Sequence, residues 1–190
     1  MNMSNYVTQN DEFNAAIPAR YIKALSHMMA KNDVRYYLNG IHVKHGVVEA
    51  SDGHVAMRIE SPDIIVKVGE KFIISVDTVK YICSGMKVND LSSTVYITDG
   101  KVFGSHADFV YGTYPDVGRI LIDPNDCSGE VGQFNPELLV RIQKAVKTLW
   151  PKVKRNKGAF ELHHNGIRGA AVKFENESET VKGVVMPWRV

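Results

Sequence analysis

The segment Val184-Val185-Met186-Pro187-Trp188-Arg189-Val190 closes the sequence as an almost unbroken apolar run. Terminal residues that fray into water are usually small and polar, so this composition indicates a tail that packs against the rest of the chain. Three other segments are the expected partners of the tail: Asp33–Gly40 (DVRYYLNG), Ser51–Met57 (SDGHVAM) and Tyr114–Leu121 (YPDVGRIL). How these four segments meet decides the fold.

Taken in order along the chain, the four segments resemble parts of the bacterial DNA polymerase III beta subunit, the processivity sliding clamp. Asp33–Gly40 resembles the start of that clamp's middle domain, and Asp52-Gly53-His54 resembles its D-G-H turn. The second match is a short turn motif, so it gains weight only from its position relative to the others.

The other two matches lie further along the chain. Tyr114-Pro115-Asp116 followed by Arg119 resembles the F-P-D-Y-R-R junction between the middle and last domains. Val185-Met186-Pro187 with Arg189 resembles the V-M-P-M-R terminus. One short match is weak evidence, but four in the correct order over most of the chain make a specific signal.

Composition limits the possible functions. The 190 residues are 44% hydrophobic, enough for one generous domain or two small ones. No apolar run approaches the roughly 18 residues of a membrane span, and the first residues lack the features of a secretory signal, so we expect a cytoplasmic protein. Cys83 and Cys127 are too isolated for a zinc site or a disulfide framework, and we expect no metal or cofactor.

The order of short segments predicts three similar units after a flexible leader of residues 1–11. Each unit is a strand, a helix and a β-meander. In the first unit the helix is expected over Ile17–Lys31, because apolar residues recur there every three or four positions. Four β-rich runs follow this helix: Val34–Leu38, Ile41–Lys44, Val47–Ala50 and Val55–Ile59.

The second and third units repeat this arrangement. The second has a helix over Asp77–Ser84, with strands expected at Phe72–Val76, Thr94–Ile97, Lys101–Gly104 and Phe109–Tyr111. In the third, Asn135 caps a helix that has Pro136 at its first position. Strands are expected there at Glu130–Phe134, Phe160–His163, Ile167–Val172 and Val181–Met186.

We therefore predict an α+β protein, and the resemblance implies the DNA-clamp fold, with helices on one face and antiparallel sheets on the other. Because two such units make one clamp domain, residues 12–121 resemble a complete domain and residues 122–190 half of another. A chain with three helix-bearing units cannot encircle a duplex alone, so a ring requires a homo-oligomer.

The net charge is only +2, so any contact with DNA must come from a local cluster of positively charged side chains. Cations spaced along the first and third helices are candidates for contacting phosphates of double-stranded DNA without reading sequence: Arg20, Lys23, His27, Lys31, Arg141, Lys144 and Lys147. The alternative is that they are the ordinary solvated side of amphipathic helices.

The resemblance also implies an apolar groove that binds a short Leu- and Phe-containing segment of a partner protein. Carried over from the motifs, its residues are Leu38, Ser51, Gly53, His54, Val55, Ala56, Pro115, Ile120, Val184, Met186, Pro187, Trp188 and Arg189. Val55, Ala56 and Trp188 depart from the residues common in the family, and Trp188 could fill part of the groove. The alternative is that the tail closes this surface as ordinary core.

These features predict a replication accessory protein that tethers a DNA polymerase or other clamp-binding protein to DNA. The alternative is a decoy or adaptor that uses the same groove to compete with a full-length clamp. A shortened clamp is of the kind that a bacteriophage or mobile element could encode. An enzyme built on Asp52, His54 and His163-His164 is a distant third, because no catalytic or metal-binding motif accompanies them.

Overall fold

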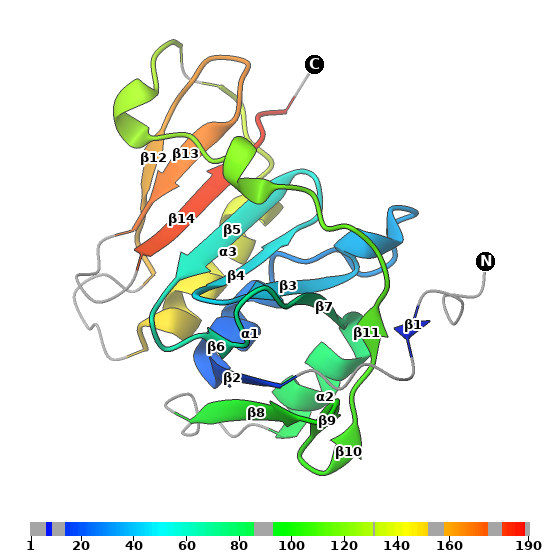
Figure 1. The fold of residues 1–190 in the computed structure, drawn as a ribbon. Coiled ribbons are helices and arrows are strands. Elements are labelled where there is room, and N and C mark those ends of the chain that lie inside the picture. The colour runs from blue at the N-terminus through cyan, green and yellow to red at the C-terminus, as the bar shows by residue number, and fades with distance from the viewer. Residues whose placement is uncertain are drawn as a thin grey trace.

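The computed structural model describes residues 7–8, 14–85, 93–130, 132–151, 158–174 and 180–188. These residues form two antiparallel sheets and three α-helices (Figure 1). The helices are α1 (Ala19–Leu25), α2 (Val76–Gly85) and α3 (Pro136–Leu149). The predicted α+β class is confirmed. No helix in this described part is both long enough and apolar enough to span a bilayer.

The larger sheet has nine strands in the order β1-β11-β7-β3-β4-β5-β14-β13-β12. In that order the strands are β1 (Val7–Thr8), β11 (Phe109–Val110), β7 (Lys71–Ser75), β3 (Gly40–Lys44), β4 (Val47–Ser51), β5 (Val55–Glu60), β14 (Thr180–Val185), β13 (Ala170–Lys173) and β12 (Glu161–His163). Pairing of β5 with β14 runs from Val55 opposite Val185 to Glu60 opposite Thr180, so the first and third units share one sheet.

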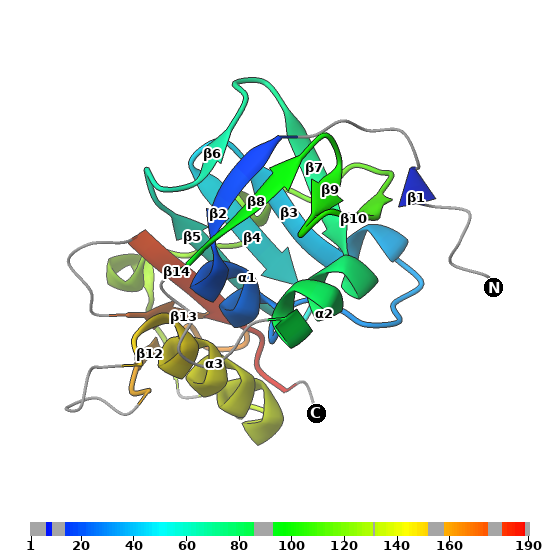
Figure 2. The ribbon, with the colours of Figure 1, turned by 90° about the horizontal axis from the view of Figure 1, so that it is seen from below.

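The smaller sheet has five strands in the order β10-β9-β8-β2-β6. In that order they are β10 (Ser105–His106), β9 (Lys101–Val102), β8 (Thr94–Thr98), β2 (Ala15–Pro18) and β6 (Ile65–Val66). Seen from below, α1 lies between α2 and α3, and the three helices gather along one side of the molecule (Figure 2). One core cluster joins buried residues of both sheets and all three helices.

The first helix is shorter than predicted at both ends. Residues 15–18 form β2 and pair with β8, and α1 ends at Leu25, so the predicted range Ile17–Lys31 is wrong. The hydroxyl of Ser26 donates to the carbonyl of Lys23, and the next turn continues with i to i+3 bonds such as that from the Met28 N–H to the Leu25 carbonyl. Met28 remains buried although it lies outside the helix.

Two predicted strands are absent from the described residues. Residues 36–38 form a 3₁₀-helix instead of part of a strand, because Asp33 and Asn39 close a loop around them: each donates a nitrogen–hydrogen group to an oxygen of the other, over 2.9 and 2.8 Å. No strand forms over residues 132–134, where the carbonyl of Gln133 accepts from the Trp188 N–H of the tail.

The predicted division at residue 121 stays a prediction, although β14 extends the sheet of the first unit. Of the predicted leader, Val7 and Thr8 form β1 opposite Val110 and Phe109. The remaining residues of the leader lie outside the described part of the chain.

Candidate functional site

A pocket of about 540 Å³ lies where the turn after β4, the start of α3 and the tail after β14 meet. Its lining is mostly apolar, with a few polar groups at the edge, which is typical of sites that bind a short peptide or a small ligand. The lining residues are Gly53, His54, Asn135, Leu138, Met186, Pro187 and Trp188.

Backbone hydrogen bonds hold the tail against the other two walls. The Met186 N–H donates to the carbonyl of His54 over 2.8 Å, and the Trp188 N–H donates to the carbonyl of Gln133 over 2.6 Å. Between them Pro187 is buried. The apolar tail therefore packs as a wall, bridging the turn and the segment before α3.

Trp188 lines the pocket without filling it. Its side chain lies at the pocket's surface and the residue is 62% exposed. An indole inserted into the pocket would be largely buried. The pocket is therefore open, and Trp188 adds apolar area to one wall.

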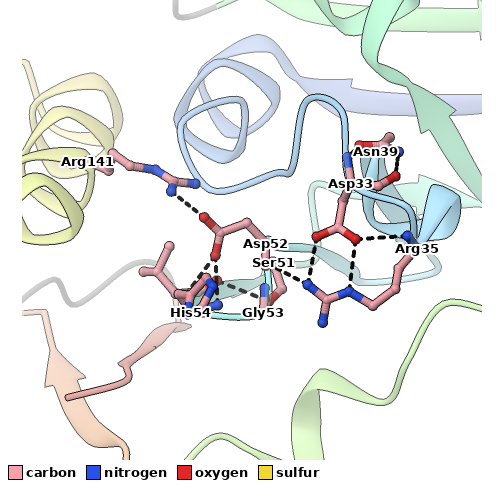
Figure 3. Close-up of polar contacts among 9 residues, drawn as sticks. Asp33, Arg35, Asn39, Ser51, Asp52, Gly53, His54 and Arg141 are labelled. Carbon is pink, nitrogen blue, oxygen red and sulfur yellow. Dashed lines mark hydrogen bonds and ion pairs between the residues drawn. The ribbon is translucent and has the colours of Figure 1, made fainter. Parts of the chain in front are cut away.

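The carboxylate of Asp52 shapes the turn that forms the opposite wall (Figure 3). One carboxylate oxygen accepts hydrogen bonds from the N–H groups of His54 and Val55, over 2.8 and 3.0 Å. The other accepts from the guanidinium of Arg141. Burial alone would raise the pKa of Asp52, but these hydrogen bonds outweigh it and lower the pKa, so the carboxylate is charged.

Arg141 holds this turn to two helices. From α3, its Nε donates to the carbonyl of His27 over 2.6 Å, and Nη2 donates to the carbonyl of Met28 over 3.0 Å, just beyond α1. Nη1 donates to Asp52. These three bonds occupy three of the five N–H donors of Arg141, so the residue that the sequence predicts to contact phosphate is engaged largely within the protein.

Arg35 supports the turn from its other side. Its guanidinium is 2.7 Å from the carboxylate of Asp33 and donates to the carbonyl of Asp52 over 3.1 Å. Gly53 follows with a φ of +90°, and a Cβ atom at that position would lie 2.7 Å from Nη2 of Arg35. The turn therefore uses the left-handed conformation that glycine adopts readily, and an added Cβ would also displace the Arg35 guanidinium.

The structure brings together five of the predicted groove residues at this pocket: Gly53, His54, Met186, Pro187 and Trp188. Five others are buried and do not line it: Leu38 in the 3₁₀-helix, and Ser51, Val55, Ala56 and Val184 in the larger sheet. Pro115 and Ile120 are exposed outside the pocket lining, and Arg189 lies outside the described residues.

Two pocket residues were missed by the sequence prediction. Asn135 caps α3 by accepting from the Glu137 N–H, and Leu138 belongs to the apolar stripe of the same helix. Each therefore has an ordinary structural explanation in the sequence. Their place in the pocket depends on long-range contacts that bring α3 to the turn and the tail, such as the bond between Arg141 and Asp52.

A buried polar network lies beneath the same turn. Glu49 accepts from His42 Nδ1 over 2.8 Å and from Arg58 Nε over 2.6 Å. Tyr114 stacks on His42, with ring centroids 5.0 Å apart, and its hydroxyl accepts from the Ser51 N–H. The network thus ties the Tyr114 segment to β3, β4 and β5.

Five of the predicted DNA-contacting residues converge between the end of α1 and α3. The pKa of His27 is lowered by burial and by the positive charges of Lys144, Lys31, Arg141 and Lys23 around it. Lys147 is exposed on α3, one turn beyond Lys144. Arg20 instead lies over its neighbour Tyr21, with the guanidinium carbon 5.0 Å from the ring centroid. The described residues contain no cluster of three or more His, Cys, Asp or Glu side chains placed to hold a metal ion.

No family model matches the chain, and no curated protein matches its sequence. Solved structures do match it. The DNA polymerase III subunit beta from Pseudomonas aeruginosa aligns with a TM-score of 0.63 at 17% identity, covering 95% of this chain and 68% of that chain. A sliding clamp from the same organism, bound to griselimycin, aligns with a TM-score of 0.56 at 16% identity, covering 100% and 70%.

The beta clamp of Helicobacter pylori in complex with 3,4-difluorobenzamide gives a TM-score of 0.64 at 12% identity, covering 95% of this chain and 67% of that chain. At sequence identities this low, the matches show a shared fold and nothing about function. The chain has the α+β fold of the DNA polymerase III beta sliding clamps.

Proposed function

We propose that this chain is a sliding-clamp-like accessory protein of DNA replication, without catalysis of its own. It binds short apolar segments of DNA polymerases or other replication proteins in the pocket between Gly53-His54, the start of α3 and the tail, and tethers them to DNA. The observation that carries the proposal is this open apolar pocket, built by three separate segments of a clamp fold.

The construction of the pocket suits a short peptide. Its walls are fixed by backbone hydrogen bonds of Met186 and Trp188 and by the Asp52 turn, so little ordering is needed on binding. The Met186 side chain can adapt to the shape of a ligand, while Leu138 and Trp188 offer apolar surface. One or two buried anchors, each contributing about 1 to 3 kcal/mol, would supply most of the affinity.

The helix side of the molecule supplies the DNA contact in this proposal. Lys23 on α1 and Lys147 on α3 both lie on helices that gather along one side (Figure 2). Lysines placed there would meet phosphates without reading bases. A closed ring around DNA would need several copies of the chain.

A fluorescence titration with a labelled peptide containing Leu and Phe anchors tests the pocket. We expect saturable binding that weakens about tenfold in Met186→Ala and in Leu138→Ala, because each removes apolar contact area. Ile167→Ala is the matched control: Ile167 is 84% exposed and lies outside the pocket, so the affinity should not change. Absence of binding, or equal affinity in all four proteins, contradicts the proposal.

The second candidate is a decoy or adaptor that competes with a full-length clamp for its partners. It is favoured by the engagement of Arg141 within the protein, which removes one cation from those predicted to meet DNA. A primer-extension assay separates the two functions. The accessory protein should lengthen the products made by its polymerase, whereas a decoy should shorten products made with a full-length clamp.

A further inference from the structure

A second, polar pocket of about 560 Å³ adjoins the apolar one. It lies between the turn that follows α1 and the middle of α3, and its lining includes Ser26, His27, Lys31, Asp52, His54 and Lys144. His54 lines both pockets. A ligand that occupies the apolar pocket can therefore extend past His54 into the polar one.

The polar pocket carries uncompensated positive charge. Its two carboxylates are already neutralised: Asp33 pairs with Arg35 at 2.7 Å, and Asp52 pairs with Arg141. Lys31 and Lys144 are exposed, and within the described part of the chain neither forms an ion pair. The lysines therefore leave an excess of positive charge, and they face the same space.

The same positive charge acts on His27. Its ring lies beside the pocket, and the neighbouring cations Lys144 and Lys31 add to burial in lowering its pKa. An anion placed between these lysines would offset their positive charge and would raise the pKa of His27 again. The site therefore favours a negatively charged ligand.

We propose that this pocket binds a carboxylate of the partner segment, so that preferred partners carry a Glu or Asp beside their apolar anchors. The inference rests on the proposed function, because it requires a peptide in the apolar pocket. Lys31 and Lys144 hold the carboxylate, and His54 separates it from the anchors. This assignment leaves Lys23 and Lys147 for DNA.

Continuity of the two pockets favours a partner carboxylate over a DNA phosphate. His54 lines both pockets, so a single short segment bound on the two sides of His54 would reach both. A carboxylate attached to an anchored peptide also has a high effective concentration at the lysines, which a separate anion lacks. Binding of a phosphate is the competing outcome.

Paired peptides test the inference. Each pair shares the Leu and Phe anchors and differs by Glu or Gln at one flanking position, and both flanks are sampled. We expect one Glu peptide to bind about threefold to tenfold more tightly than its Gln partner, with the difference declining as salt rises. The difference should disappear in Lys31→Ala/Lys144→Ala and persist in Lys147→Ala, which removes one positive charge from the next turn of α3.

Several results would overturn the inference. Equal affinity of Glu and Gln peptides at both flanks removes it while leaving the proposed function intact, because the anchors still bind. If the affinity difference between Glu and Gln peptides is also lost in Lys147→Ala, the peptides respond to the overall positive charge of the surface and not to a site at Lys31 and Lys144. If Lys31→Ala/Lys144→Ala weakens binding of a DNA duplex but leaves the affinity of every Glu and Gln peptide as it is in the native protein, the pocket serves phosphate. If neither peptide of any pair binds, the proposed function fails together with this inference.

Discussion

Gly53 is the residue at which turn geometry and pocket shape depend most directly on one side chain. Its φ of +90° disfavours any L-residue, and an added Cβ would press on the guanidinium of Arg35. That guanidinium could move aside, but it would then lose its bond to the carbonyl of Asp52. The wall of the pocket would shift with it.

Gly53→Ala should therefore destabilise the fold and weaken peptide binding. Gly46→Ala is the matched control, because Gly46 also has a positive φ, +75°, but nothing lies within 4 Å of its added Cβ. We expect the control to lose about 1 kcal/mol of unfolding free energy from the backbone alone, and Gly53→Ala to lose more. Denaturant unfolding and peptide titration of both variants measure this. Equal losses with unchanged peptide affinity would contradict the role given to Gly53.

The charge of Asp52 contributes to the stability of the fold and to the shape of the pocket wall. Asp52→Asn keeps the side chain's size but weakens the bonds to Arg141 and to the N–H groups of His54 and Val55. We expect a loss of about 1 to 3 kcal/mol in unfolding free energy and weaker peptide binding. Asp77→Asn, at an exposed pair with Lys80, is the control and should change little.

The pH dependence of this contribution has a definite sign. Because the folded state lowers the pKa of Asp52 below its ordinary value of 3.8, the contribution is present above that value and is lost as pH falls through the folded pKa. The stability difference between the native protein and Asp52→Asn should therefore shrink in acid. If the stability difference between the native protein and Asp52→Asn is the same at neutral and acid pH, the Asp52 charge does not make this contribution.

At the scale of elements, the buried network joins β3, β4 and β5 through Glu49, His42 and Arg58. Glu49 is 1% exposed. Burial would raise its pKa, but hydrogen bonds from His42 and Arg58 lower it below the ordinary value of 4.5. A charge held in this way stabilises the sheet only while both partners remain.

Glu49→Gln should cost about 3 kcal/mol in unfolding free energy at neutral pH, because it leaves Arg58 without its buried counter-charge. The native protein should lose this contribution as pH falls below about 4.5 and through the folded pKa of Glu49, whereas Glu49→Gln should not. Denaturant titrations at several pH values measure both. Glu60→Gln, at a carboxylate 3.9 Å from Arg58 and more exposed, is the control. Equal stability of the two variants would argue against a stabilising network.

The predicted helices match the structure in which residues are buried, but not always in where the helix begins and ends. For α3, the Asn135 cap and Pro136 fix the start, and the structure begins the helix at that proline. For α1, the spacing of Tyr21, Ile22 and Leu25 correctly predicts burial, but it extends into residues that are buried without being helical. Apolar spacing reports which residues face the core, while the Ser26 bond that accompanies the end of α1 has no strong signal in the sequence.

The pocket was predictable where local turn chemistry and the tail motif define it. Gly53, His54, Met186 and Pro187 follow from those motifs. The role of Arg141 could not be predicted from the sequence, because its position on the helix is also typical of a solvent-exposed cation. Its partners, Asp52 and the carbonyls after α1, are distant in sequence and meet only in the folded chain.

At the scale of the whole molecule, pairing of β5 with β14 places the third unit beside the first and aligns α3 with α1. This arrangement sets the cations of both helices on one side. In the proposed function, Lys23 and Lys147 release counterions when they meet DNA phosphates.

The salt dependence of DNA binding tests that placement. Lys23→Ala/Lys147→Ala should weaken binding of a duplex irrespective of its sequence, and should reduce the slope of log affinity against log salt by about 2. Lys71→Ala/Lys101→Ala removes two exposed cations from β7 and β9 and is the control. An equal effect of both double variants would indicate general charge in place of a DNA-facing side.

The mass of the protein in solution, measured by light scattering with and without duplex DNA, tests the central claim most directly. A clamp-like tether must stay on DNA, and in the proposed function a ring around a duplex needs several copies of the chain. The account predicts a DNA-bound species containing more than one copy of the chain. A strict monomer that binds no DNA would contradict it.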